Sequence, residues 1–177
     1  MDCRQALEIL RAGLPLENRR IDGELDLTEL ASDEEIHVPI VIRNAEIESL
    51  VTMNGYFQKP VVLERVRFAG EVSFWCGYFF AGFSATDCEF GGLVGFENGG
   101  HNRDGSEFRL KDCVFRKFVN FLDCWYEGPV YVQGCRFEEG TNLLGMVDEP
   151  CRVSFDVTPI IENNVGNLAL NQDWSRA

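Results

Sequence analysis

The chain is 177 residues long and 45% hydrophobic, and its 16 basic and 29 acidic residues give a net charge of −13. This length fits one domain, so residues 1–177 are treated as a single unit. The acidic balance argues against a nucleic-acid partner, which needs a basic face, and no apolar run is long enough to predict a membrane span.

Residues 2–13 predict a short α-helix that caps one end of the fold. Asp2 and Gln5 form a candidate capping box, the apolar residues at 6, 9 and 10 share one face, and Gly13 marks the end. Residues 14–39, which include the acidic segment 32–35, are predicted to form an irregular first coil.

Residues 40–143 predict regular coils, because large apolar residues recur at steps that alternate between five and six. In the clearest stretch these residues are Leu110, Phe115, Phe121, Tyr126, Val132 and Phe137. A further apolar residue precedes each by two positions, which is the pattern of a short strand with one buried face. Eleven residues cannot enclose Phe side chains, so two such units predict a four-sided coil of about 22 residues.

Stacked coils predict continuous columns of inward side chains. One column is Phe68, Phe90, Phe115 and Phe137, a second is Val66, Cys88, Cys113 and Cys135, and a third is Phe74, Phe96 and Phe121. Three extra residues within 99–106 delay the repeat once. Near the start of the regular coils, the inward pairs are predicted to be Ile40-x-Ile42, Ala45-x-Ile47, Val51-x-Met53 and Gly55-x-Phe57.

The pattern loosens in residues 144–177, which predict an irregular C-terminal coil or cap. Pro150 and Pro159 interrupt its strand-like pairs, and a loose tail is expected from Gln172 onward.

The Cys-x-Phe and Val-x-Phe pairs over roughly residues 40–143 resemble the pattern of pentapeptide-repeat proteins. That family places a large apolar residue at the centre of each side and a small one two positions earlier. Here Phe replaces the usual Leu, Cys or Val replaces the usual Ala, and steps of five and six replace the uniform five. The resemblance implies a divergent member with an all-β fold, a right-handed quadrilateral parallel β-helix, here with an N-terminal helical cap. It also implies a non-enzymatic protein, since most members have no catalytic role.

We expect no catalytic residues, no cofactor and no metal site. The only histidines are His37 and His101, and neither a phosphate-binding loop nor a Ser/His/Asp order is present. The seven cysteines contain no Cys-x-x-Cys pair. Several occupy inward positions, where free cysteines act as small core residues. Reduced cysteines and the absence of a signal-peptide pattern at residues 1–4 favour the cytoplasm.

Outward aromatic residues gather around the insertion. Tyr78 and Trp125 lie 47 residues apart, which is two coils plus the three inserted residues, so they are predicted to share an outer column. The inserted loop either packs over these rings or forms a recognition patch with them, since Trp, Tyr and Arg are common hot-spot residues. The candidate interaction patch is Trp75, Tyr78, Phe80, His101, Asn102, Arg103, Asp104, Trp125 and Tyr131.

These observations favour an interaction scaffold that binds an unidentified protein. One alternative is an acidic DNA mimic that regulates a DNA-binding enzyme, because some pentapeptide-repeat proteins inhibit gyrase in this way. A third is a carbohydrate-active β-helix enzyme with carboxylates on its outer face. A continuous acidic stripe would favour mimicry, a deep carboxylate-lined cleft would favour an enzyme, and an aromatic patch would favour protein binding. Asp112 and Asp123 are expected at corners.

The C-terminal segment carries more apolar residues than one thin coil can cover. They are Leu143, Leu144, Met146, Val147, Ile160, Ile161, Leu168 and Leu170. We therefore expect a homodimer through this end, with the acidic N-terminal coils pointing outward where their charges repel least.

Overall fold

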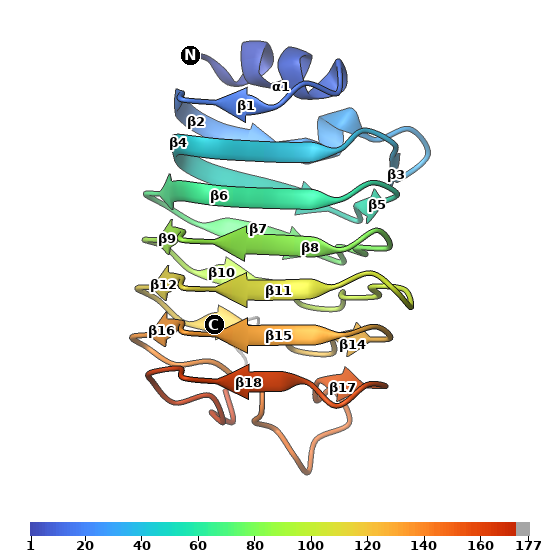
Figure 1. Ribbon diagram of the computed structural model, residues 1–177, viewed down its shortest axis with the longest axis vertical. Coiled ribbons are helices and arrows are strands. Elements are labelled where there is room, and N and C mark those ends of the chain that lie inside the picture. Colours follow the sequence, from blue (N-terminus) through green and yellow to red (C-terminus); the bar gives the residue numbers. More distant parts are fainter. Residues whose placement is uncertain (173–177) are drawn as a thin grey trace.

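The protein is a right-handed parallel β-helix, as the sequence predicts. In the computed structural model, which describes residues 1–172, the coils stack beneath an N-terminal helix (Figure 1). The chain passes from the right side across the front to the left side and the back as it descends, which gives the right-handed winding. One complete coil runs from Val61 to its strand partner Phe83, which matches the coil length expected from the repeat.

Each coil has four sides, which we name A to D in chain order. Side A contains β1 (Leu16–Glu17), the starts of β4 (Ile40–Met53) and β6 (Val61–Phe68), β8 (Phe83–Thr86), β11 (Phe108–Lys111), β15 (Val130–Gln133) and β18 (Ile160–Glu162). Side B contains the start of β2 (Arg20–Asp26), the middle of β4, the end of β6, β9 (Glu89–Phe90), β12 (Val114–Phe115) and β16 (Arg136–Phe137).

The other two sides hold shorter strands. Side C contains the ends of β2 and β4, β7 (Val72–Trp75), β10 (Val94–Gly95) and β13 (Val119–Asn120). Side D contains β3 (Glu35–Ile36), β5 (Tyr56–Phe57), β14 (Trp125–Tyr126) and β17 (Ser154–Phe155). Because β4 and β6 continue around corners, most strands join one sheet.

The N-terminal end is closed by helix α1 (Cys3–Arg11), which confirms the predicted cap. Asp2 is the N-cap, and its carboxylate accepts a hydrogen bond of 2.8 Å from the backbone N–H of Gln5. The apolar face of α1 packs onto the first coil and is buried at Ala6, Leu7 and Leu10. This first coil is irregular, with a register shift in β2 and a 3₁₀ helix at Leu27–Leu30.

The core consists of the predicted columns. On side B, ring centroids are 5.0 Å apart between Phe68 and Phe90, 4.7 Å between Phe90 and Phe115, and 4.8 Å between Phe115 and Phe137. Offset stacking of this kind adds about 0.5–1.5 kcal/mol per pair beyond the burial of apolar area. The neighbouring Cys88, Cys113 and Cys135 are at most 2% exposed. The side C rings Phe74, Phe96 and Phe121 also stack.

Left-handed backbone accompanies the five-residue steps at two of the four corners. The five-residue steps between sides A and B contain a residue with positive φ, at Asn44, Arg65, Asp87, Asp112, Gly134 and Asn163. The steps between sides C and D do so at Asn54, Cys76, Asn98 and Asp123. Asn and Asp tolerate this conformation better than most residues, and the expected corner residues Asp112 and Asp123 are among them.

One predicted inward pair is wrong. Strand β4 turns Leu50 and Thr52 inward instead of Val51 and Met53. Thr52 pairs with Phe74 and is fully buried, whereas Met53 is 54% exposed. The chain turns the corner from Ile47 to Leu50 in a step that is one residue shorter than the matching step from Phe68 to Val72 in the next coil. The missing residue moves the inward positions of β4 back by one, from Val51 and Met53 to Leu50 and Thr52. A β-branched Thr fits this position in a strand, although hydrophobicity alone favours Met.

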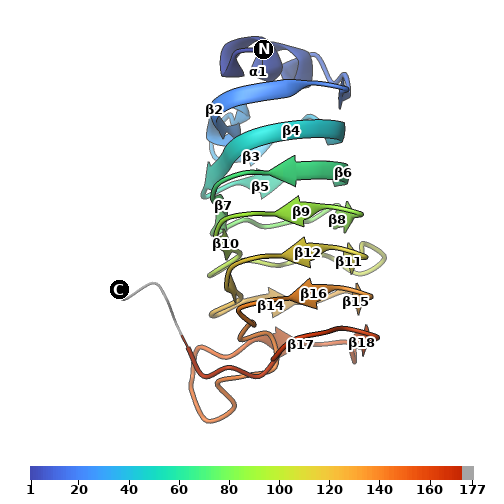
Figure 2. The ribbon, with the colours of Figure 1, turned by 90° about the vertical axis from the view of Figure 1, so that its left-hand side faces the viewer.

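The C-terminal end is built from one irregular coil. Residues 144–152 project past the last strands (Figure 2), and β17 and β18 follow. The predicted pair Leu168-x-Leu170 forms no strand. A loose tail was predicted from Gln172 onward, and its residues after Gln172 lie outside the described part of the chain. Within residues 1–172, no helix is long and apolar enough to cross a membrane.

Candidate interaction surface

Side D carries a continuous row of outward rings, which we call the ring column: Tyr56, Tyr78, His101 and Trp125. Tyr56 stacks on Tyr78, Tyr78 and His101 are tilted against each other, and His101 meets Trp125 edge to face. Ring centroids are 4.9 Å apart between Tyr56 and Tyr78, 4.1 Å between Tyr78 and His101, and 5.3 Å between His101 and Trp125. The sequence leaves an open position between Tyr78 and Trp125, and His101 of the inserted loop fills it. The ring column therefore crosses four successive coils.

The alternation of side chains along a strand places these rings. Tyr56, Tyr78 and Trp125 each directly precede an inward ring, and adjacent side chains point to opposite faces. In the coil between Tyr78 and Trp125, the strand position itself belongs to Gly100, which pairs with both. Its φ is +100°, and a Cβ there would lie 2.5 Å from the Trp125 carbonyl oxygen. A glycine is required here, and the next residue supplies the ring.

The inserted loop is held by Asn102, which is fully buried. Its side-chain nitrogen donates hydrogen bonds of 2.9 Å to the Ser106 carbonyl and 3.0 Å to the Pro129 carbonyl. Its side-chain oxygen accepts from the Gly128 N–H at 3.3 Å. Asn102 therefore fastens the loop to the next coil and presents no side chain to a partner.

The same loop packs on the aromatic residues at two points. His101 lies against Tyr78, and the guanidinium of Arg103 lies 3.9 Å from the ring centroid of Phe80. Phe80 also contacts the ring of Tyr78, at 5.9 Å between centroids. Asp104 is exposed. The loop supplies His101 to the ring column and leaves Trp125 45% exposed, so it does not cover the column.

Two other predicted residues lie on different sides. Trp75, which is 39% exposed, ends β7 on side C beside Met53. The corner at Cys76 separates it from Tyr78, so it extends the apolar surface around that corner. Tyr131 lies on side A, where the guanidinium of Arg109 is 4.1 Å from its ring centroid. Tyr131 is thus not part of the ring column.

Carboxylates border the ring column. Glu127 lies 3.0 Å from the Nδ1 of His101, and Asp156 accepts a hydrogen bond of 2.9 Å from the indole N–H of Trp125. The charge of Glu34 is the main cause of a raised Tyr56 pKa. Sequence reasoning missed Tyr56, although it precedes Phe57 as Tyr78 precedes Phe79. It also missed the bordering carboxylates, which come from separate coils and share no spacing.

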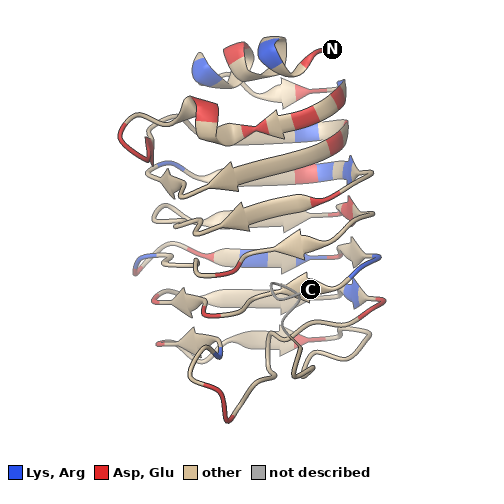
Figure 3. Ribbon diagram, turned by 180° about the vertical axis from the view of Figure 1, so that it is seen from behind, with Lys and Arg blue, Asp and Glu red and all other residues tan. Residues whose placement is uncertain are grey.

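Basic residues lie among the acidic ones along the coils (Figure 3). Arg43 forms ion pairs with Glu17 at 3.2 Å and Glu64 at 2.7 Å. Arg116 contacts Glu89 at 3.1 Å and also pairs with Glu138 on the next coil. The acidic residues in these coils therefore form mixed-charge ladders between strands.

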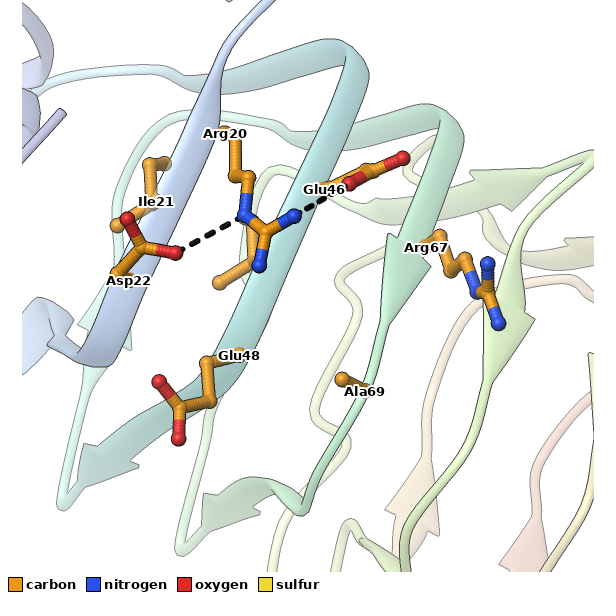
Figure 4. A pocket seen from close by; sticks show the side chains of 8 residues that line it. Arg20, Ile21, Asp22, Glu46, Glu48, Arg67 and Ala69 are labelled. Atoms are coloured by element: carbon orange, nitrogen blue, oxygen red, sulfur yellow. Dashed lines mark hydrogen bonds and ion pairs between the residues drawn. The ribbon is translucent and has the colours of Figure 1, made fainter.

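A hollow of about 440 Å³ lies on side B near the N-terminal end (Figure 4). The guanidinium of Arg20 lies 3.0 Å from the carboxylate of Asp22 and 3.8 Å from that of Glu46. Glu48 accepts a hydrogen bond of 2.7 Å from the backbone N–H of Gly23. Arg67 borders the far side of the hollow, and its own ion pair, at 4.0 Å, is with Glu89. These charges also connect neighbouring coils.

No cluster of three or more potential metal ligands occurs within residues 1–172. Comparisons with protein-family models, with curated proteins and with solved structures found no match. The function is therefore inferred from the geometry of the surface.

Proposed function

We propose that this β-solenoid is a divergent pentapeptide-repeat protein that acts as a non-enzymatic scaffold and binds another protein through the ring column. The observation that carries the proposal is the unbroken row of ring contacts from Tyr56 to Trp125 on one outer side. The core columns stabilise the coils from the inside, whereas this row of rings lies on the outside, where Trp125 is 45% exposed and can contact a partner.

The ring column has the properties of a binding hot spot. Tyr and Trp combine large apolar area with a polar group, and they dominate the energetics of many interfaces. Contacts with neighbouring rings and the hydrogen bond of Trp125 hold the rings in place before binding, so little side-chain entropy is lost when a partner binds. Glu127 and Asp156 at the border favour a partner segment in which basic residues flank apolar ones.

The two alternatives, an acidic DNA mimic and a carbohydrate-active enzyme, have weaker support. DNA mimicry needs an unbroken acidic stripe, whereas residues such as Arg43 and Arg116 divide the acidic residues into ion pairs. A glycosidase needs two free carboxylates in a cleft, whereas the hollow on side B contains two arginines. All seven cysteines are free thiols, which supports a reducing cytoplasmic location.

Affinity capture with matched variants tests the proposal. The double variant Tyr78→Ala/Trp125→Ala removes two rings of the column, and Tyr131→Ala removes a ring from side A. We expect proteins from the source cell to be retained by the wild type and by Tyr131→Ala, and lost by the double variant. Equal retention by all three proteins, or no specific retention by the wild type, would contradict a binding role for the ring column.

A further inference from the structure

The ring column ends at Trp125, and within the described residues this ring has an aromatic neighbour on one side only, His101. Its strand partner in the next coil is Ser154, which is too small to continue the column. Trp125 is 45% exposed, whereas Tyr56 and Tyr78 are less exposed. The end of the column therefore presents the largest accessible aromatic surface of the four rings.

Two carboxylates lie beside this accessible ring. Strands β14 and β17 pair in register, and the residues that follow their inward rings are Glu127 and Asp156. Both side chains therefore point outward on adjacent strands. Asp156 accepts the indole N–H of Trp125 at 2.9 Å, while Glu127 contacts His101. Like charges at neighbouring positions of a sheet repel each other, and a cation bound by both would remove this repulsion.

Carboxylates elsewhere on the coils are already paired with such a cation. On side A, Arg43 lies between Glu17 and Glu64, one on each neighbouring coil, at 3.2 and 2.7 Å. Within residues 1–172, by contrast, no Arg or Lys forms an ion pair with Glu127 or Asp156, and the only ionisable partner of Glu127 is a histidine. The end of the ring column therefore has the carboxylates of a charge ladder without its basic residue.

The chain itself shows which cation fits a ring with a carboxylate beside it. The guanidinium of Arg109 lies 4.1 Å from the ring centroid of Tyr131, and its N–H groups donate hydrogen bonds of 2.7 and 3.2 Å to Glu107. A planar guanidinium can stack on a ring while its edge faces a carboxylate, whereas an ammonium group has no plane to stack. Trp is the ring that attracts cations most strongly.

We infer that an arginine of the partner protein binds at the end of the ring column. Its guanidinium stacks on the exposed surface of the Trp125 ring, and its N–H groups donate to the carboxylates of Asp156 and Glu127. This inference rests on the proposed function and specifies the partner, which places an arginine beside the apolar residues that contact Tyr56 and Tyr78. The net charge of −13 attracts such a basic segment from solution.

NMR titration with the peptide acetyl-Gly-Arg-Gly-amide tests the inference, because the indole N–H of Trp125 reports on both the ring and Asp156. We expect a saturable shift of this signal at about millimolar peptide, as for a single side chain on a surface ring. The same peptide with citrulline keeps the planar shape without the charge, and the peptide with lysine keeps the charge without the plane. Both should bind at least about fivefold more weakly.

Asp156→Asn keeps an oxygen for the indole N–H but removes the charge, and it should weaken binding of the arginine peptide by a similar factor. Glu8→Gln is the matched control, because it removes the same charge from an exposed position on α1, at the opposite end of the molecule (Figure 1). Its affinity for the arginine peptide should equal that of the wild type, and backbone amide spectra confirm that both variants fold.

Three results would each overturn the inference: no saturable shift with the arginine peptide, equal binding of the lysine or citrulline peptide, or equal weakening by Asp156→Asn and Glu8→Gln. The proposed function has its own readout in the affinity capture. If a cellular protein is retained through Tyr78 and Trp125 while the arginine peptide fails to bind, the binding role of the ring column stands and only the arginine anchor is wrong.

Discussion

The two ends of the β-helix solve the same physical problem differently. A coil buries its inward side chains only when another layer lies above and below it. At the N-terminal end that layer is α1, which leaves Ala6, Leu7 and Leu10 at most 3% exposed. At the C-terminal end the last inward residues, such as Phe155, remain partly exposed. The repeat therefore specifies the interior of the fold, whereas a separate sequence must specify each end.

The largest expected difference is in thiol reactivity between the interior and the open end. Cys88, Cys113 and Cys135 are buried in internal coils, whereas Cys151 is partly exposed in the last coil. Modification of a buried thiol requires unfolding, which costs about 5–15 kcal/mol in small domains, so native labelling should be about 10⁴-fold slower or more. Burial also raises the pKa of the Cys124 thiol to about 12, which further disfavours its reactive thiolate.

Mass spectrometry after timed alkylation measures these rates residue by residue. Rapid modification of all three column cysteines would contradict their burial. The wild type unfolded in denaturant serves as the control, since all seven cysteines should then react.

A second test compares an internal ring with its counterpart at the open end. Phe115 stacks between Phe90 and Phe137, so Phe115→Ala should reduce the free energy of unfolding by about 3–5 kcal/mol. Phe155 stacks on one side only, and Phe155→Ala should cost about half as much because the site is already partly hydrated. Chemical denaturation measures both. Equal losses would mean that the C-terminal end is covered as well as the interior.

A third test weakens the N-terminal cap. Leu10 is fully buried between α1 and the first coil, so Leu10→Ala should destabilise the protein by about 2–3 kcal/mol. Ile9→Ala is the control, because Ile9 lies on the same helix but is only partly buried, and it should cost less. If the two variants lose equal stability, the helix does not seal the coil through the face that contains Leu10.

The smallest expected effect concerns the start of the cap. Asp2→Ala removes the acceptor for the Gln5 N–H and should destabilise α1 by about 1 kcal/mol. Asp2→Asn keeps an oxygen at the same place and should restore most of that stability. Thermal unfolding of the two variants checks this, and equal melting temperatures would argue against the capping interaction.

The parts of the fold that repeat could be predicted from the sequence. One core column is evident from Phe90, Phe115 and Phe137. These residues occupy the same position in three successive repeats, and all three are Phe. Thr52 was missed because hydrophobicity favours Met53 next to it, and only the shorter corner in β4 reverses that preference. Pattern analysis fails where a coil changes length.

The candidate site was predictable only in part. Tyr78 and Trp125 share a phase, so their common column follows from counting residues. Asn102 lies in the inserted loop and has no counterpart in the other coils. Its side chain is buried because it bonds the carbonyls of Ser106 and Pro129 and the N–H of Gly128, and the sequence alone does not show that these groups surround it. Side chains that bind backbone groups across coils leave no periodic signal.

The insertion before β11 also bears on how this chain can acquire new sequence. The coil from Phe90 to its partner Phe115 is longer than the coil from Phe68 to Phe90, because it contains the added loop. The entropic cost of closing a loop grows only as (3/2)RT ln n, so each doubling of the loop's length costs about 0.6 kcal/mol. Longer segments between Asn102 and Ser106 should be tolerated almost as well. The corner beside the ring column is therefore a natural place for grafting peptides, where a new epitope would leave the register of every coil unchanged.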